Sequence, residues 1–350
     1  MSDLAKWKLL GPVHSARIAT AEWDLNREEW QPSRSFAVAV FHPDGKILES
    51  EHHNPDGSVL QSKFVYDQAG RLTETQFRNE DEPAGRILYS YDDAGRLLRT
   101  LQVDPEGNQR ESEVCSYDSR GRKTKVCFLP PAISGQPWMT VIEGTELGYG
   151  APGATTMTVN YGDTGLSEEA LFPDAQHILV RRVTFERRAD GKLLSEELCS
   201  GDQAPWPDLQ KRLKDASPDG AARVAGVFGT LFGPARAISR TNYVYDRDGR
   251  LTGRTTRLGS ISETHDTFLY DEHGNTVEQT TEQNSRELQM DEQGSLKTAS
   301  ERSSVQHSRM EYRYDGQGNW TERVIWSRLE PNPNLQRSNI ERREITYYAV

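Results

Sequence analysis

A short turn motif recurs along the chain and restricts its fold more than any other feature. An aromatic residue or Met is followed by Asp, two variable residues and Gly, and the motif returns at intervals of roughly 20–26 residues within each uninterrupted block. Its members are Tyr66, Asp67 and Gly70; Tyr91, Asp92 and Gly95; Tyr117, Asp118 and Gly121; Tyr245, Asp246 and Gly249; Tyr270, Asp271 and Gly274; Met290, Asp291 and Gly294; and Tyr314, Asp315 and Gly318. Simpler turn signals stand between them: Pro43-Asp44-Gly45, Pro55-Asp56-Gly57, Pro105-Glu106-Gly107 and Asp190-Gly191. One recurring signal predicts one structural unit used many times.

The residue types of the motif predict the tip of a β-hairpin. Asp at the first turn position can accept a hydrogen bond from the backbone N–H two residues further on, which closes an Asx turn. Gly three residues after Asp stands where a type I turn passes into a left-handed residue. A side chain at that position costs about 1–2 kcal/mol. Pro-Asp-Gly serves the same kind of turn because Pro sets φ at its second position.

The residues beside each motif predict strands with one buried face. Before the turn, a ring or Cys alternates with another residue, as in Phe64-x-Tyr66, Tyr89-x-Tyr91, Cys115-x-Tyr117, Tyr243-x-Tyr245, Phe268-x-Tyr270 and Tyr312-x-Tyr314. After the Gly come Leu72, Leu97, Leu251, Leu296 or Trp320, which can pack across the hairpin on those rings. We therefore predict a mainly β protein: a long antiparallel sheet of stacked hairpins that curves or spirals into a partial shell.

Charge and composition narrow the class of protein. The 350 residues include 42 Lys and Arg against 53 Asp and Glu, a net charge of −11, which disfavours a general nucleic-acid binder. The 13 Tyr, 10 Phe and 7 Trp argue against disorder, because disordered chains are poor in aromatic residues. The three cysteines, Cys115, Cys127 and Cys199, cannot build a disulfide framework and are expected to be small buried thiols.

The hydrophobic pattern bears on location. No apolar run approaches the ~18 residues that a membrane-spanning helix needs. The start of the chain has no basic region followed by an apolar stretch, so it does not read as a Sec signal peptide. We expect a protein without a membrane span, either cytoplasmic or exported by a specialised secretion system.

Interruptions of the motif predict five segments. Residues 1–35 are expected to cap the first sheet edge, with a smaller prospect that Trp7, Trp23 and Trp30 form a ligand platform. Residues 36–128 form the first repeat block, and 129–200 form degenerate, strand-rich linking repeats with a turn at Gly165. Residues 201–237 carry apolar side chains at helical spacing and predict a small inserted helical segment. Residues 238–350 form the second block with closing strands.

The string Tyr-x-Tyr-Asp-x-x-Gly-Arg-Leu resembles the YD repeat of the RHS family, and Tyr312 to Thr321 resembles the closing segment of short RHS-like bacterial proteins. The resemblance covers roughly residues 36–128 and 178–348. It implies a sheet that spirals into a hollow shell, which in large members encloses a toxin. The chain lacks the paired-aspartate autoprotease signature of those members and a toxin-sized segment after its last repeat, so toxin delivery is not implied.

Candidate chemistry is sparse. The eight histidines are scattered, and no metal-ligand, redox or phosphate-loop string is present, so we expect no catalytic residue, metal or cofactor. The repeated aspartates could suggest calcium binding or glycoside hydrolysis, but each has a local task in its own turn. The Arg that follows the turn Gly, at Arg71, Arg96, Arg122 and Arg250, is expected to face the Asp across the tip as a solvated pair of little energetic weight.

The function expected from these patterns is non-enzymatic. The first hypothesis is an RHS-like module that binds, scaffolds or partly encloses a protein or glycan partner. The alternatives are an immunity or accessory factor of a bacterial toxin system and, less favoured, a carbohydrate-active enzyme. A large buried lumen would favour the first hypothesis, a flat closed sheet the immunity or accessory factor, and a cleft with two close carboxylates the enzyme.

Overall fold

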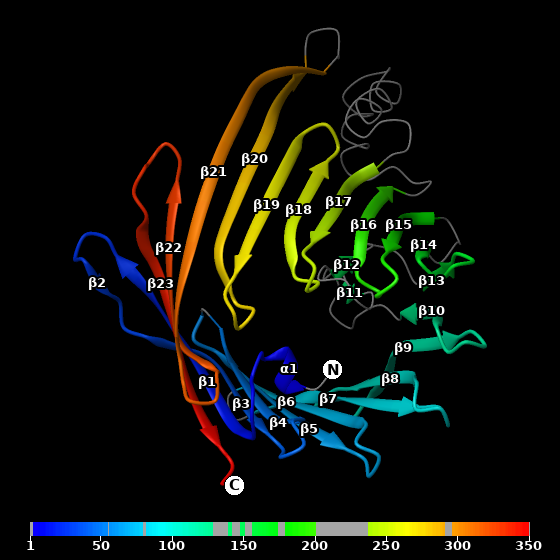
Figure 1. The fold of residues 1–350 in the computed structure, drawn as a ribbon. Helices are drawn as coiled ribbons and strands as arrows, with labels where there is room; N and C mark the ends of the chain where they lie inside the picture. The colour runs from blue at the N-terminus through cyan, green and yellow to red at the C-terminus, as the bar shows by residue number, and fades with distance from the viewer. Residues whose placement is uncertain are drawn as a thin grey trace. The chain divides into compact units, whose positions relative to one another are not determined.

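The described residues fold mainly into antiparallel strands (Figure 1). The computed structural model describes residues 3–54, 56–79, 82–128, 139–141, 148–150, 156–173, 179–200, 237–290 and 296–349. Within these ranges the only helix is α1 (Asp3–Lys6), a single turn, and 21 strands belong to one sheet. This bears out the expected mainly β, antiparallel hairpin class.

The strands follow one another with short turns between most of them. Their bounds are β1 (Val13–Asp24), β2 (Glu29–Trp30), β3 (Arg34–Phe41), β4 (Ile47–His53), β5 (Val59–Tyr66), β6 (Leu72–Asn79), β7 (Glu82–Tyr91), β8 (Leu97–Val103), β9 (Gln109–Tyr117), β10 (Lys123–Phe128), β11 (Met139–Val141), β12 (Gly148–Gly150), β13 (Thr156–Tyr161), β14 (Ser167–Pro173), β15 (Leu179–Arg187), β16 (Leu193–Ser200), β17 (Ala237–Tyr245), β18 (Leu251–Leu258), β19 (Ser262–Tyr270), β20 (Thr276–Met290), β21 (Leu296–Tyr314), β22 (Trp320–Leu329) and β23 (Gln336–Tyr347). β11 and β12 pair only with each other.

Sequence neighbours pair as hairpins, but the first strand departs from that rule. β1 pairs with β3 on one side and with β23 on the other, with Ala16 opposite both Ala39 and Ile345. The first and last long strands of the chain are therefore joined, and the strand order closes through β1. This corrects the expectation of an open partial shell, because β1 pairs with a strand on each side.

The chain divides into two compact units, each with its own core. Unit 1 comprises residues 1–112, 270–278 and 307–350, and unit 2 comprises residues 113–269 and 279–306. The core of unit 1 contains buried Leu9, Val13, Ala16, Ala39 and Phe41, against which Leu4, Trp7, Ile47, Ile345 and Tyr347 pack. Leu4, Trp7 and Leu9, which precede β1, therefore help to bury this face of the sheet.

The core of unit 2 follows from strict alternation along its strands. Ala170 on β14 lies opposite Val183 on β15, Phe172 and Phe185 belong to the same cluster, and all four are nearly inaccessible to solvent. Cys115, Val126, Met157, Val159 and Leu193 complete the cluster. Side chains of period two lie on one face, so this face is dry and the other carries Glu, Thr and Arg.

The turn motifs form hairpin tips with one repeated geometry. In the first, Asp67 N donates to Arg71 O at 2.9 Å and Gly70 N donates to Asp67 O at 2.9 Å, with Gly70 at φ 76°. Asp67 Oδ1 accepts from Arg71 N, four residues on, at 2.8 Å. The sequence analysis predicted that the Asp side chain accepts from the N–H two residues further on. Asp118 and Asp315 accept from that N–H as well as from the one four residues on. The left-handed glycine, which lacks a Cβ to clash, is what permits the turn.

Several expectations fall outside the described residues. The helical segment at 201–237 does so except for Ala237, which begins β17, and so does the motif at Asp291–Gly294. The division into five segments stays a prediction. Gly165 does form the expected degenerate turn, with its N–H donating to Gly162 O at 2.9 Å and φ 71°.

Candidate functional site: the hairpin tips and a polar hollow

Four hairpin tips end in Arg and share one charge arrangement. We call these the Arg tips: residues 67–71, 92–96, 118–122 and 246–250. In each, the Arg Nε donates to Oδ2 of its own Asp at 2.6–2.8 Å. The Asp Oδ1 accepts the backbone N–H of the same Arg at 2.8 Å in all four. Those hydrogen bonds, the backbone one first, hold the pKa of Asp67, Asp92, Asp118 and Asp246 below its usual range.

The cation of a tip also contacts the tyrosine of the next hairpin. The guanidinium carbon of Arg71 lies 5.2 Å from the ring centre of Tyr91, and that of Arg122 lies 4.1 Å from the ring of Tyr161. Contacts of this kind at exposed sites are worth about 0.5–1 kcal/mol. The Arg expected to be only a solvated partner of its Asp therefore also links two hairpins.

The same tyrosines donate back to the previous hairpin. Tyr66 OH donates to Ile47 O at 2.8 Å, and Tyr91 OH donates to Leu72 O at 2.7 Å. Tyr161 and Tyr312 repeat the bond, with acceptors Lys123 O and Thr276 O. Every acceptor is the second residue after a turn glycine. Tyr66 and Tyr91 stand at the aromatic position of the motif, whereas Tyr312 stands two residues before it, so tyrosines at both positions link one hairpin to the previous one.

Two described tips of the aromatic-Asp-x-x-Gly motif end in Asn and are built differently, whereas at the Pro-Glu-Gly turn the side chain of Asn108 donates to Asp104 within its own tip. We call these the Asn tips: residues 271–275 and 315–319. Tyr314 OH donates to Asp271 Oδ2, and Tyr347 OH donates to Asp315 Oδ2. The Asn Nδ2 donates to the same tyrosine oxygen, at 2.9 Å from Asn275 and 2.8 Å from Asn319. Burial first, and then the bond to the carboxylate, raise the pKa of Tyr314 and of Tyr347.

Asn319 additionally holds the segment that precedes β1. Its Oδ1 accepts from Leu10 N at 2.7 Å and its Nδ2 donates to Leu10 O at 2.8 Å. Asn319 is 1% exposed and Leu10 is 55% exposed, so this clamp joins a buried carboxamide to a segment at the surface. The sequence analysis did not predict this clamp. The presence of Asn instead of Arg after the turn glycine is the signal that could have indicated it.

Two arginines lie on Trp320 near this tip. The guanidinium carbon of Arg343 lies 3.6 Å from the indole centre, and that of Arg323 lies 5.3 Å away. Arg323 Nη2 donates to both oxygens of Glu341 at 2.6 Å, whereas Arg343 Nη2 donates to Trp7 O at 3.2 Å. Burial, with Arg323 next, lowers the pKa of Arg343 to about 10. Sequence patterns alone gave no sign of this cluster.

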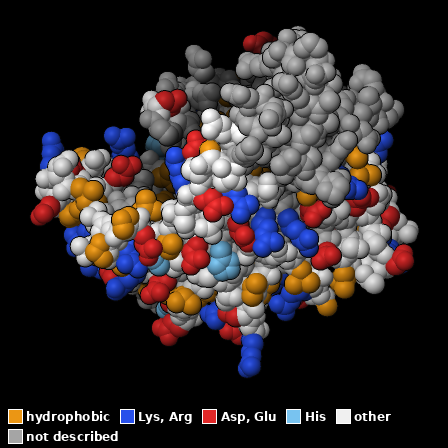
Figure 2. All heavy atoms as spheres, turned by 90° about the horizontal axis from the view of Figure 1, so that it is seen from above, with side chains coloured by type: hydrophobic (Ala, Val, Ile, Leu, Met, Phe, Trp, Pro, Cys, Tyr) orange, Lys and Arg blue, Asp and Glu red, His pale blue; other side chains and the backbone are white. Residues whose placement is uncertain are grey.

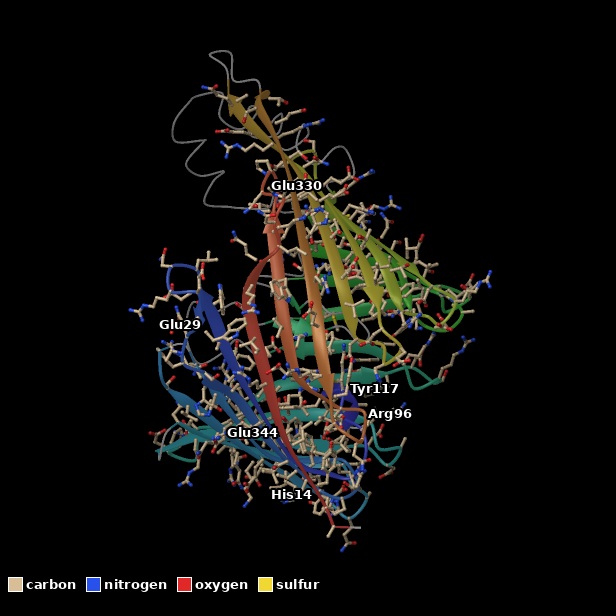
Figure 3. The ribbon with its side chains drawn as sticks, turned by 60° about the vertical axis from the view of Figure 1, so that its left-hand side comes forward. His14, Glu29, Arg96, Tyr117, Glu330 and Glu344 are labelled. Atoms are coloured by element: carbon tan, nitrogen blue, oxygen red, sulfur yellow. The ribbon has the colours of Figure 1, made fainter. Side chains whose placement is uncertain are left out.

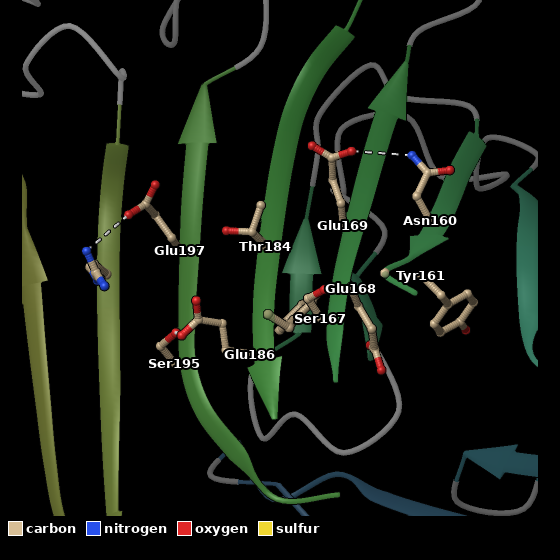
Figure 4. Close-up of a pocket in the computed structure, with 12 residues that line it drawn as sticks. Asn160, Tyr161, Ser167, Glu168, Glu169, Thr184, Glu186, Ser195 and Glu197 are labelled. Carbon is tan, nitrogen blue, oxygen red and sulfur yellow. Dashed lines mark hydrogen bonds and ion pairs between the residues drawn. The ribbon is translucent and has the colours of Figure 1, made fainter. Parts of the chain in front are cut away.

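A polar hollow lies on the wet face of unit 2 (Figure 4). It measures about 430 Å³ and crosses β13 to β17, with Glu169, Thr184 and Glu197 in one row. Asn160 Nδ2 donates to Glu169 at 3.3 Å, and Arg240 pairs with Glu197 at 3.8 Å. A second hollow of about 520 Å³ lies between β18–β19 and β20–β21, where Arg257 pairs with Glu263 at 2.9 Å and Arg286 with Glu301 at 3.0 Å. Both are lined mainly by polar residues, several of which are ion-paired.

The face seen in Figure 2 carries a mixed set of side chains. Acidic, basic and apolar side chains are interspersed over the described part of the face in Figure 2. Side chains project from both faces of the strands in Figure 3, where His14 on β1 is labelled; its Nδ1 lies 3.3 Å from Thr346 Oγ1. Trp23 and Trp30, considered as a platform, face each other across β1 and β2 with centroids 4.9 Å apart, and Trp7 packs elsewhere on Phe41.

Within the described ranges, no group of three or more His, Cys, Asp or Glu is placed to hold a metal ion. Cys115 and Cys199 are buried and Cys127 is half-buried, all as free thiols. Burial, with Glu113 next, raises the pKa of Cys115 to about 11. The described part of the chain also contains no helix with the length and apolar character needed to cross a bilayer.

No family model matches the chain, and no curated protein matches it. Among solved structures, a porin-like protein from Bacteroides uniformis ATCC 8492 aligns with 96% of this chain and 99% of its own, at 10% identity and a TM-score of 0.34. A porin-like protein from Bacteroides vulgatus ATCC 8482 aligns with 97% and 99%, at 10% identity and a TM-score of 0.28. Likenesses this distant do not by themselves assign an activity to the chain.

These findings correct the expectations that rested on the RHS resemblance. The named structures are porin-like, no family model matches, and β1 joins the two ends of the strand order. The RHS identity, the scaffold or encapsulation function, and the toxin-immunity and carbohydrate-enzyme alternatives are contradicted. So are the protein or glycan partner, the absence of a membrane span, and the cytoplasmic or specialised-export location. The physical reason is that the motif specifies a hairpin tip, which any antiparallel sheet can use.

Proposed function

We propose that this chain is a non-enzymatic structural protein whose antiparallel sheet is held together at its hairpin tips. One observation carries the proposal: at the described tips, the polar side chains of the motif are used in bonds within the turn or to the next hairpin. The Arg tips use the carboxylate locally and the guanidinium on the following ring. The Asn tips use the carboxylate on the following tyrosine.

The alternative task for these residues would be chemistry, which needs a group free to act on a substrate. A carboxylate that accepts two or three hydrogen bonds keeps its charge and its position, and its lowered pKa makes it a poor proton donor near neutral pH. The Asp residues of the Arg tips have those bonds and that direction of shift. Their arrangement therefore supports a structural task.

Two isosteric variants test the proposal. We expect Asp246→Asn to lower the melting temperature, because it weakens the bond to Arg250 Nε, and Glu186→Gln in the polar hollow to leave it unchanged. Wild type should show no turnover of chromogenic glycosides, esters or phosphate esters. Turnover that disappears in Glu186→Gln or Asp246→Asn, with the melting temperature unchanged, would overturn the proposal.

A further inference from the structure

The two Asn tips have the same internal bonds but different surroundings. Both place a Tyr hydroxyl between the Asp Oδ2 and the Asn Nδ2, and both donate the Asn backbone N–H to the Asp Oδ1, at 2.8 Å and 2.9 Å. The carboxamide plane is therefore fixed in the same way in each. What differs is the free side of the carboxamide.

At the 315–319 tip, that side binds a backbone. The N–H and C=O of Leu10 bond the two atoms of the Asn319 carboxamide, as a neighbouring strand would do with its own peptide group. The Leu10 side chain lies over the turn glycine, since a Cβ on Gly318 would stand 3.5 Å from Leu10 Cδ1. The carboxamide thus bonds the backbone of one residue of an extended chain, and the glycine leaves room for the apolar side chain of that residue.

At the 271–275 tip, the same side is open among the described residues. Asn275 donates to Tyr314, but its Oδ1 has no hydrogen-bond partner in the described part of the chain. A Cβ on Gly274 would meet nothing within 4 Å. The ring of His273 lies 4.2 Å from that of Tyr314, so it covers the tyrosine and not the glycine.

We infer that the 271–275 tip is a binding site for a short extended peptide, which it holds as Asn319 holds Leu10. Asn275 bonds the N–H and C=O of one ligand residue, and the apolar side chain of that residue lies over Gly274. Asp271 and the 89% exposed Glu272 favour a ligand with basic residues beside the apolar one. The segment around Leu10 has that composition, with Lys6 and Lys8 before it. This goes beyond the proposed structural function, because a structural tip needs no ligand.

The test uses an end-capped peptide of residues 6–12, labelled for fluorescence anisotropy, with the full-length chain. We expect saturable binding that Asn275→Asp weakens at least tenfold, because the donor of the carboxamide is lost. Asn108→Asp is the matched control: Asn108 holds the same turn position, but its Nδ2 donates to Asp104 within its own tip at 2.8 Å. It should leave binding unchanged.

Two further changes keep the inference falsifiable if Asn275→Asp disturbs the fold. Gly274→Asn retains a residue that tolerates the left-handed conformation, but fills the space above the turn, and it should abolish binding with an unchanged circular dichroism spectrum. A peptide N-methylated at the residue equivalent to Leu10 lacks the N–H and should not bind. No saturable binding at millimolar peptide, or binding lost in Asn319→Asp but not in Asn275→Asp or Gly274→Asn, would overturn the inference.

Discussion

The Arg tips and the Asn tips share one backbone and differ in where the aspartate finds its partner. In the Arg tips the carboxylate is bonded by Arg of the same hairpin, as Asp92 is by Arg96 at 2.6 Å. In the Asn tips it is bonded by the tyrosine of another hairpin, as Asp271 is by Tyr314. In the Arg tips the long cation reaches back to the carboxylate, whereas in the two Asn tips the carboxamide bonds the neighbouring tyrosine hydroxyl. The residue after the turn glycine does not decide this alone, because Asn108 donates to Asp104 within its own tip.

The difference shows that the strength of the contact between neighbouring hairpins can change while the backbone of the turn stays the same. An Arg tip completes its electrostatics locally and touches the next hairpin through a weak cation–π contact. An Asn tip completes them only when the next hairpin is in place, through a charge-assisted hydrogen bond, which is the stronger kind. Hairpins that meet at an Asn tip are therefore expected to unfold together.

The largest effect is expected at Asn319. Asn319→Ala removes three hydrogen bonds of a buried side chain, two to the backbone of Leu10 and one to Tyr347, which costs about 2–4 kcal/mol in the free energy of unfolding. Urea denaturation measures it. Asn108→Ala, at the same position of an exposed tip, should change the value by less than about 0.5 kcal/mol. Equal losses in the two variants would contradict the role given to the clamp.

The next largest effect is expected to be equal in the two classes of tip. Gly95→Ala in an Arg tip and Gly274→Ala in an Asn tip should each cost about 1–2 kcal/mol through left-handed strain, since φ is 78° and 79° and neither site is crowded. Gly316→Ala, where φ is outside that region and nothing lies within 4 Å, is the control. A clear difference between the two tip glycines would show that their backbones are not equivalent.

Alkaline pH should weaken the Asn tips by removing the proton of the tyrosine hydroxyl that bonds the aspartate. The pKa of Tyr314 is raised by burial and by the bond to Asp271, so the folded state keeps a proton that the unfolded state loses above about pH 10. The stability that this bond supplies is complete below that pH and is lost as pH rises through the folded pKa. Absorbance titration of Asp271→Asn should show a tyrosine ionising at lower pH than in wild type. An unchanged titration would argue against the bond.

Acid should produce the smallest effect, at the Arg tips. Because the pKa of Asp92 lies below its usual range, its bonds add stability above about pH 4 that is lost as pH falls through the folded pKa. Arg96→Met should therefore flatten the decline of melting temperature between pH 5 and pH 3. The same decline in wild type and variant would show that the pair adds nothing measurable, as is common for exposed pairs.

The hairpin tips could be predicted from the sequence because the interactions that form them are local. An Asp, a left-handed Gly and flanking rings specify a turn within a few residues, and Gly70 and Gly249 take the positive φ that the motif predicts. Gly259, which stands outside the motif, also has φ 50°, so positive φ is not confined to it. Neighbouring hairpin pairing followed from the same local signals.

What the sequence did not reveal depends on contacts distant along the chain. The pairing of β1 with β23 and the bond of Asn319 to Leu10 join residues more than 300 positions apart. No turn signal encodes them. The same limit explains the wrong family inference, since turn chemistry fixes a hairpin and leaves the arrangement of hairpins open.

The tip aspartate should be coupled to the tyrosine of the next hairpin in an Asn tip but not in an Arg tip. A pair of double-mutant cycles measures this coupling free energy directly. One cycle combines Asp271→Asn with Tyr314→Phe, and the other combines Asp67→Asn with Tyr91→Phe, with unfolding free energies from urea denaturation. We expect a coupling of about 1–2 kcal/mol between Asp271 and Tyr314. Between Asp67 and Tyr91 we expect no measurable coupling, because Arg71 bonds the carboxylate and Tyr91 donates to Leu72 O. Equal coupling in both cycles, or none between Asp271 and Tyr314, would contradict the account.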